Sequence, residues 1–134
     1  MNRHVLIVED DPHNATLFRK IVEKRMACDV TVTDSPDMMF SVLRTRGAGL
    51  VVLDVSLGSS EWQGQPVNGI DLCRVLKADP QLHGIPVLLA TAHAMRGDAE
   101  RLLAESGADD YVAKPILDHA AFVELARVLM ERAA

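Results

Sequence analysis

The chain has 134 residues, with 14 basic and 19 acidic side chains and a formal net charge of −5. Its size predicts one domain that needs no disulfide or metal crosslink, and a composition of 49% hydrophobic and 25% charged residues excludes a disordered chain. The acidic balance, without a dense run of Lys and Arg, argues against direct binding to nucleic acid or to an anionic membrane surface.

Short apolar runs alternate with amphipathic stretches along the sequence. The runs are mostly β-branched and apolar on both faces, which is typical of strands buried in a parallel sheet. In chain order we predict a strand at 5–8, a helix at 15–26, a strand at 30–32, a helix at 36–46 after Ser35 as N-cap, a strand at 50–53, a helix at 70–77 behind Asn68, a strand at 87–90, a helix at 95–106 before Gly107, a strand at 111–113 and a last helix from Asp118.

This alternation predicts right-handed crossovers and an α/β fold. The expected architecture is a doubly wound five-stranded parallel sheet in the order 2-1-3-4-5, a flavodoxin-like arrangement. Strands 1 and 3 are then neighbours, and ligands bind at the carboxyl ends of the strands. We therefore expect the functional residues directly after the apolar runs.

The cysteines and the first apolar run bear on the compartment. Cys28 and Cys73 have no metal-ligand spacing, which predicts buried free thiols in a reducing environment. The run at 5–8 is too short for a signal-peptide core or a membrane span. We expect a cytoplasmic protein without membrane insertion.

Acidic residues follow the first and third predicted strands. Glu9, Asp10 and Asp11 come after the first strand, and Asp54 comes after the third. Two such charges about 4 Å apart repel by about 4 kcal/mol at an effective dielectric constant of about 20, and a divalent cation would remove this cost. Oxygen ligands from separate loops favour Mg²⁺ over Ca²⁺, and zinc is disfavoured because no His or Cys joins them. Asp11 has a second possible role, as a cap of the first helix.

A hydroxyl and an ammonium group follow the last two predicted strands. Thr91 comes after the fourth strand and Lys114 after the fifth. These are suitable donors around a phosphoryl group, whose transfer depends on positioning and charge neutralisation. Together with Asp54 they indicate phosphoryl transfer to a carboxylate.

The four motifs together resemble the receiver domain of two-component response regulators, the CheY-like family. They are Val-Glu-Asp-Asp at 8–11, Leu-Asp at 53–54, Ala-Thr-Ala at 90–92 and Lys-Pro at 114–115. The resemblance covers nearly the whole chain. It implies that Asp54 accepts a phosphoryl group from a histidine kinase or a histidine phosphotransfer protein in a Mg²⁺-dependent reaction, and that the chain signals to a downstream protein partner.

The resemblance also implies roles for the neighbouring residues. It assigns the magnesium ion to Glu9, Asp10, Asp54 and the backbone carbonyl of Ser56. Asp11 is then left as the helix cap.

For the switch, the resemblance implies that Lys114 pairs with a phosphoryl oxygen and that its bond to Pro115 is cis. Thr91 donates its hydroxyl to another oxygen, and Tyr111 turns inward when Thr91 moves. This motion rearranges the face formed by helix 4, strand 5 and helix 5. His93 and Ser56 occupy positions that tune the phosphoryl lifetime in the family.

One segment departs from the family pattern. Residues 57–67, between the acceptor and the third helix, are several residues longer than the usual loop. Trp62 in this insertion is either an anchor for a partner or a side chain that folds back on the domain.

We expect residues 1–134 to be a single receiver domain without an effector domain. An alternative is a receiver module of a hybrid histidine kinase or phosphorelay protein. A phosphatase of the haloacid-dehalogenase type would also use Asp54 as nucleophile, but it carries a second acid where this chain has Ser56. A flavodoxin-like cofactor binder needs a Ser/Thr/Gly-rich phosphate loop after the first strand, where this chain is acidic.

Overall fold

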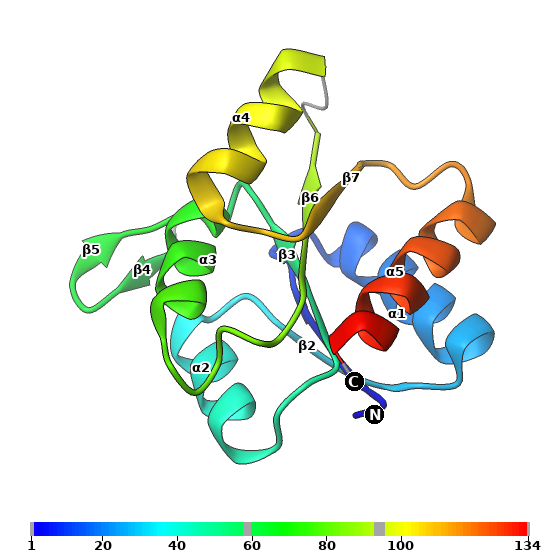
Figure 1. The fold of residues 1–134 in the computed structure, drawn as a ribbon, viewed down its shortest axis with the longest axis horizontal. Coiled ribbons are helices and arrows are strands. Elements are labelled where there is room, and N and C mark those ends of the chain that lie inside the picture. Colours follow the sequence, from blue (N-terminus) through cyan, green and yellow to red (C-terminus); the bar gives the residue numbers. More distant parts are fainter. Residues whose placement is uncertain (1, 58–59, 93–95, 134) are drawn as a thin grey trace.

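A five-stranded parallel sheet forms the centre of the protein in the computed structural model, which describes residues 2–57, 60–92 and 96–133 (Figure 1). The strands are β1 (His4–Val8), β2 (Asp29–Thr33), β3 (Leu50–Asp54), β6 (Val87–Thr91) and β7 (Asp110–Ala113). Their spatial order is β2-β1-β3-β6-β7, and each neighbouring pair is parallel. Counted within this sheet, the order is 2-1-3-4-5, which confirms the predicted fold.

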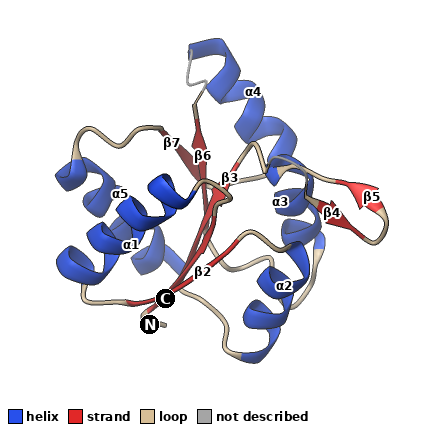
Figure 2. Cartoon of the chain, turned by 180° about the vertical axis from the view of Figure 1, so that it is seen from behind, coloured by secondary structure: helices blue, strands red, loops and turns tan. Residues whose placement is uncertain are grey.

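Helices cover both faces of the sheet, as the two opposite views show (Figures 1 and 2). One layer contains α1 (Pro12–Met26) and α5 (His119–Ala133), and the other contains α2 (Pro36–Thr45), α3 (Gly69–Ala78) and α4 (Arg96–Ser106). The predicted start of the fourth helix at Met95 lies outside the described residues. The two ends of the chain lie together at the edge of the sheet opposite the carboxyl ends of the strands (Figure 1).

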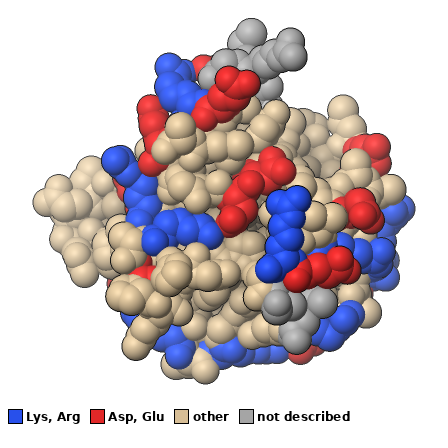
Figure 3. Space-filling view, in the orientation of Figure 1, with Lys and Arg blue, Asp and Glu red and all other residues tan. Residues whose placement is uncertain are grey.

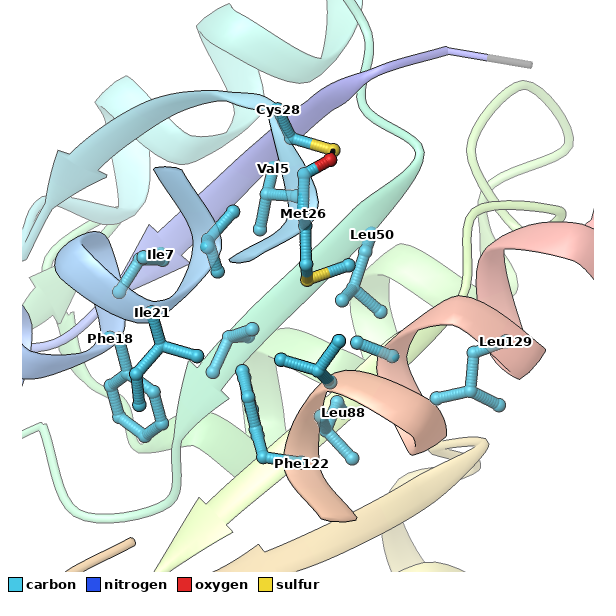
Figure 4. Packing of buried hydrophobic residues seen from close by; sticks show 14 of the residues in the cluster. Val5, Ile7, Phe18, Ile21, Met26, Cys28, Leu50, Leu88, Phe122 and Leu129 are labelled. Atoms are coloured by element: carbon cyan, nitrogen blue, oxygen red, sulfur yellow. Dashed lines mark hydrogen bonds between the residues drawn. The ribbon is translucent and has the colours of Figure 1, made fainter. Parts of the chain in front are cut away.

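The strands are apolar on both faces because each face packs against a helical layer. Val5 and Ile7 of β1 contact the cluster under α1 and α5, whereas Leu6 and Val8 contact the cluster under α2 and α3. Figure 4 shows the first cluster, in which the rings of Phe18 and Phe122 lie 5.6 Å apart. Each large side chain buried in this way stabilises the fold by about 1.5–3 kcal/mol.

The predicted helix caps are present. The Ser35 side chain accepts a hydrogen bond from the Met38 amide at 3.2 Å, and Asn68 forms a capping box with Asp71. Asp11 accepts a hydrogen bond from the His13 amide at 2.8 Å, so its role is that of a cap. The first helix begins at Pro12, three residues before the predicted start, because proline is well suited to the position after a cap.

The inserted segment contains a β-hairpin, which was not predicted from the sequence. β4 (Glu61–Trp62) pairs antiparallel with β5 (Gln65–Pro66). Gln63 and Gly64 both have positive φ, at 54° and 77°, as a two-residue hairpin turn of type I′ requires. The hairpin folds back on the domain, since the ring of Trp62 lies 5.1 Å from that of Phe40 in α2.

The two cysteines are free and buried, as predicted. Burial raises the pKa of both thiols, and that of Cys73 reaches about 11.

None of the helices in the described part of the chain has the length and apolar character that a bilayer crossing requires.

Candidate functional site

The carboxyl ends of β1, β3, β6 and β7 bring the predicted site residues to one edge of the sheet. Asp54 is the last residue of β3 and is in register with Ala90 of β6. The backbone pairing continues past the strands, because the Glu9 amide donates to the Thr33 carbonyl and the Val55 amide to the Ala90 carbonyl, both at 3.0 Å. These bonds fix the backbone that carries the Glu9 and Asp54 side chains.

Three carboxyl groups meet at this edge. Glu9, Asp10 and Asp54 each offer an oxygen atom, and these atoms lie within 4.8 Å of one another. The side chains of Glu9 and Asp54 are only 1% and 3% exposed, while Asp10 is exposed. Because charges this close repel strongly at low dielectric, the cluster favours a compensating positive charge.

Lys114 supplies part of that compensation from the end of β7. Its ammonium nitrogen Nζ lies 2.8 Å from Asp54 Oδ1 and 3.0 Å from Glu9 Oε1. The Lys114 amide donates to the Thr91 carbonyl at 2.8 Å, which holds the residue beside β6. The bond between Lys114 and Pro115 is cis, as expected.

The surroundings shift the pKa values of these groups in the direction expected for a buried acidic cluster. Burial, with the neighbouring Asp54 carboxyl, raises the pKa of Glu9 to about 7. Burial likewise raises the pKa of Asp10. Burial lowers the pKa of Lys114, but the hydrogen bonds to Asp54 and Glu9 outweigh this effect and raise it overall.

The carboxylate cluster fits a hard divalent cation. Glu9 Oε2 is buried and has no hydrogen-bond partner among the described residues. This oxygen atom is therefore available to a bound cation. The three residues of the cluster offer oxygen atoms only, which favours Mg²⁺ and disfavours zinc. Few protein ligands at a solvent-accessible edge suit an ion that retains several water molecules.

A hollow of about 340 Å³ opens above Asp54. Asp10, Ser56 and Lys114 are among the residues that line it. The Ser56 amide donates to Asp54 Oδ1 at 3.2 Å and orients the carboxylate. A small anionic group can therefore reach Asp54 and Lys114 together.

Gly69 supports the site, a role that was not predicted from the sequence. Its amide donates to the Val55 carbonyl at 2.9 Å. A Cβ atom at this position would lie 2.0 Å from the backbone oxygen of Asp54, so only glycine fits here. The close approach brings α3 directly against the backbone of the candidate acceptor.

Thr91 and Tyr111 lie at different places relative to this hollow. Thr91 ends β6, is 2% exposed and adjoins Ala92, which lines the hollow. Tyr111 is half-buried on β7 and lines a separate hollow of about 380 Å³ between β7 and α5, rather than the one above Asp54. His93 lies outside the described residues.

Comparison with known proteins identifies the family. The model of the response regulator receiver domain matches residues 5–127. The polar-differentiation response regulator DivK of Brucella ovis is 34% identical over 116 residues, which are 87% of this chain and 87% of that protein.

Solved structures share the fold. The receiver domain of a signal transduction histidine kinase from Syntrophus aciditrophicus superposes with a TM-score of 0.79 at 27% identity, covering 96% of this chain and 90% of that one. NtrX from Brucella abortus superposes with a TM-score of 0.83 at 21% identity; the match covers 99% of this chain but only 28% of NtrX. The chain belongs to the family of response regulator receiver domains.

Proposed function

We propose that Asp54 accepts a phosphoryl group from a phosphohistidine on a histidine kinase or a histidine phosphotransfer protein. The observation that carries this proposal is the position of the Asp54 carboxylate, 2.8 Å from the Lys114 ammonium and beside the carboxyl groups of Glu9 and Asp10. A carboxylate oxygen attacks phosphorus, and the bond from phosphorus to the histidine nitrogen breaks. The nitrogen keeps the electron pair, and Asp54 becomes an acyl phosphate.

The metal ligands in this proposal are Glu9, Asp10, Asp54 and the backbone carbonyl of Ser56. Bound Mg²⁺ supplies charge neutralisation between the attacking carboxylate and the incoming phosphoryl group. Asp54 is oriented by the Ser56 amide, and Lys114 is placed to pair with a phosphoryl oxygen. The buried position of Glu9 supports its role, because its orphan oxygen has a partner once a cation is bound.

The signal in this proposal passes to a downstream protein through the face of α4, β7 and α5. Thr91 donates its hydroxyl to the phosphoryl group, and Tyr111 responds as the switch residue. The hollow beside Tyr111 supports this choice, since most of its lining residues on β7, on α5 and between them are apolar, and one of them, Leu117, is 89% exposed. The phosphoryl contacts bias two conformations of this face.

A phosphoryl analogue tests the proposal without the cognate donor. Wild-type protein with Mg²⁺ is expected to bind beryllofluoride, and Asp54→Asn is expected to lose this binding because the attachment oxygen is absent. Backbone amide NMR spectra of both proteins, with and without the analogue, measure the effect. Equal spectral changes in the two proteins would remove Asp54 from the role of acceptor.

A further inference from the structure

The β4–β5 hairpin is attached to the rest of the domain at two points. Trp62 packs on Phe40 of α2 with a ring separation of 5.1 Å. At the base of the hairpin, the Ser60 hydroxyl donates to the Asp34 carbonyl at 3.4 Å, and the Val67 amide donates to the Ser60 carbonyl at 3.1 Å. The hairpin tip projects from the α2–α3 side, and Figure 3 shows it as a lobe that is mostly uncharged on the face in view.

These contacts place one acidic residue of the hairpin at a hollow that shares Asp10 with the candidate cation site. Glu61 and Asp34, which lies between β2 and α2, line a hollow of about 260 Å³. Asp10 lines this hollow and also the hollow above Asp54. The inserted hairpin therefore extends the negative surface that surrounds the carboxylate cluster.

The carboxyl groups of Asp34 and Glu61 are not neutralised by an ion pair among the described residues. In the described part of the protein, no ion pair joins Asp34, Glu61 or Asp10 to a basic side chain. Lys114, by contrast, forms ion pairs with Glu9 and Asp54. An exposed unpaired carboxylate attracts a divalent ion through solvent over a distance of about one Debye length, about 10 Å at 0.1 M salt. Such an attraction is long-ranged, needs no direct coordination and disappears at high salt.

We propose that Glu61 and Asp34 are electrostatic determinants of cation affinity in the Asp54 site, and that Trp62 positions Glu61 for this role. The inference rests on the proposed Mg²⁺-dependent function. It assigns the inserted hairpin a part in loading the site with its cation. The two carboxylates remain outside the coordination sphere and act through their charge.

Mg²⁺ titrations followed by amide NMR test the proposal on the whole chain. At an ionic strength of about 0.02 M, Glu61→Gln and Asp34→Asn are each expected to raise the Kd for Mg²⁺ by about two- to threefold, and the double variant by about fivefold. At about 0.5 M salt the same variants are expected to match wild type, since the Debye length is then only about 4 Å. Glu131→Gln, at the far end of α5, serves as the charge-matched control and is expected to bind Mg²⁺ as wild type does.

Two further variants separate positioning from charge. Trp62→Ala frees the hairpin and is expected to raise the Kd for Mg²⁺ about twofold at low salt, whereas Trp62→Phe keeps a ring on Phe40 and restores wild-type affinity. Equal Mg²⁺ affinity of wild type and the double variant at low salt would overturn the inference, as would a loss that persists unchanged at high salt. A wild-type chain that binds no Mg²⁺ would overturn the proposed function as well, so the two failures are distinguishable.

Discussion

Gly69→Ala is expected to destabilise the protein by about 3 kcal/mol or more, because overpacking against backbone cannot be relieved by a change of rotamer. The added methyl group would lie 2.0 Å from the Asp54 backbone oxygen and 2.9 Å from the Val55 Cα atom. Relief requires α3 to move away from β3, which breaks the hydrogen bond from the Gly69 amide to the Val55 carbonyl. Urea unfolding followed by far-UV circular dichroism measures the free energy of unfolding.

Gly84→Ala is the matched control for this substitution. No heavy atom lies within 4 Å of a Cβ atom built on Gly84, so the same change in composition is expected to alter stability by less than about 1 kcal/mol. Equal stabilities of the Gly69 and Gly84 variants would contradict the close packing of α3 on the acceptor backbone. The Gly69 variant is also expected to weaken Mg²⁺ binding if it folds, because Asp54 moves with its backbone.

Lys114→Met is expected to destabilise the protein by about 2–3 kcal/mol at neutral pH in the absence of divalent cations. The substitution keeps the length of the side chain but leaves the Glu9 and Asp54 carboxyl groups buried without their ammonium partner. Mg²⁺ is expected to restore much of the loss, because a cation bound to the folded state takes over the neutralisation and stabilises by mass action. Urea unfolding in EDTA and in excess Mg²⁺ measures both effects.

Asp54→Asn provides the opposite change of charge in the same cluster. Removing one of three clustered carboxylates relieves repulsion, so this variant is expected to be as stable as wild type or more stable without Mg²⁺. The double variant with Lys114→Met is expected to recover part of the stability lost through Lys114 alone. A loss for Lys114→Met that is identical with and without Mg²⁺ would show that the side chain acts through packing rather than charge.

The sheet and the carboxylate cluster could be predicted from sequence because they depend on short, strong patterns. The run at 50–53 is apolar at every position, as is typical of a strand buried on both faces, and Asp54 ends that run. Parallel topology then brings Glu9 and Asp10 to the same edge without further information. The Ser35 and Asn68 caps were readable because each side chain bonds to backbone only three residues away.

The hairpin and the role of Gly69 depend on tertiary contacts and had no comparable signal. β4 and β5 have two residues each, too few to show alternation, and Gln63 takes a positive φ that favours glycine or asparagine. The packing of Trp62 on Phe40 joins segments that are distant in sequence. Gly69 stands out only when its distance from the Asp54 carbonyl is known.

Phosphorylation mapping is the most direct test of the central claim that Asp54 carries the phosphoryl group. The chain is incubated with Mg²⁺ and a phosphorylated histidine kinase or phosphotransfer protein, the product is reduced with borohydride, and its peptides are sequenced by mass spectrometry. An aspartyl phosphate is converted to homoserine by this treatment, so the proposed role of Asp54 predicts homoserine at position 54 and an unmodified peptide when Mg²⁺ is omitted. Homoserine at another aspartate, with position 54 unmodified, would contradict it.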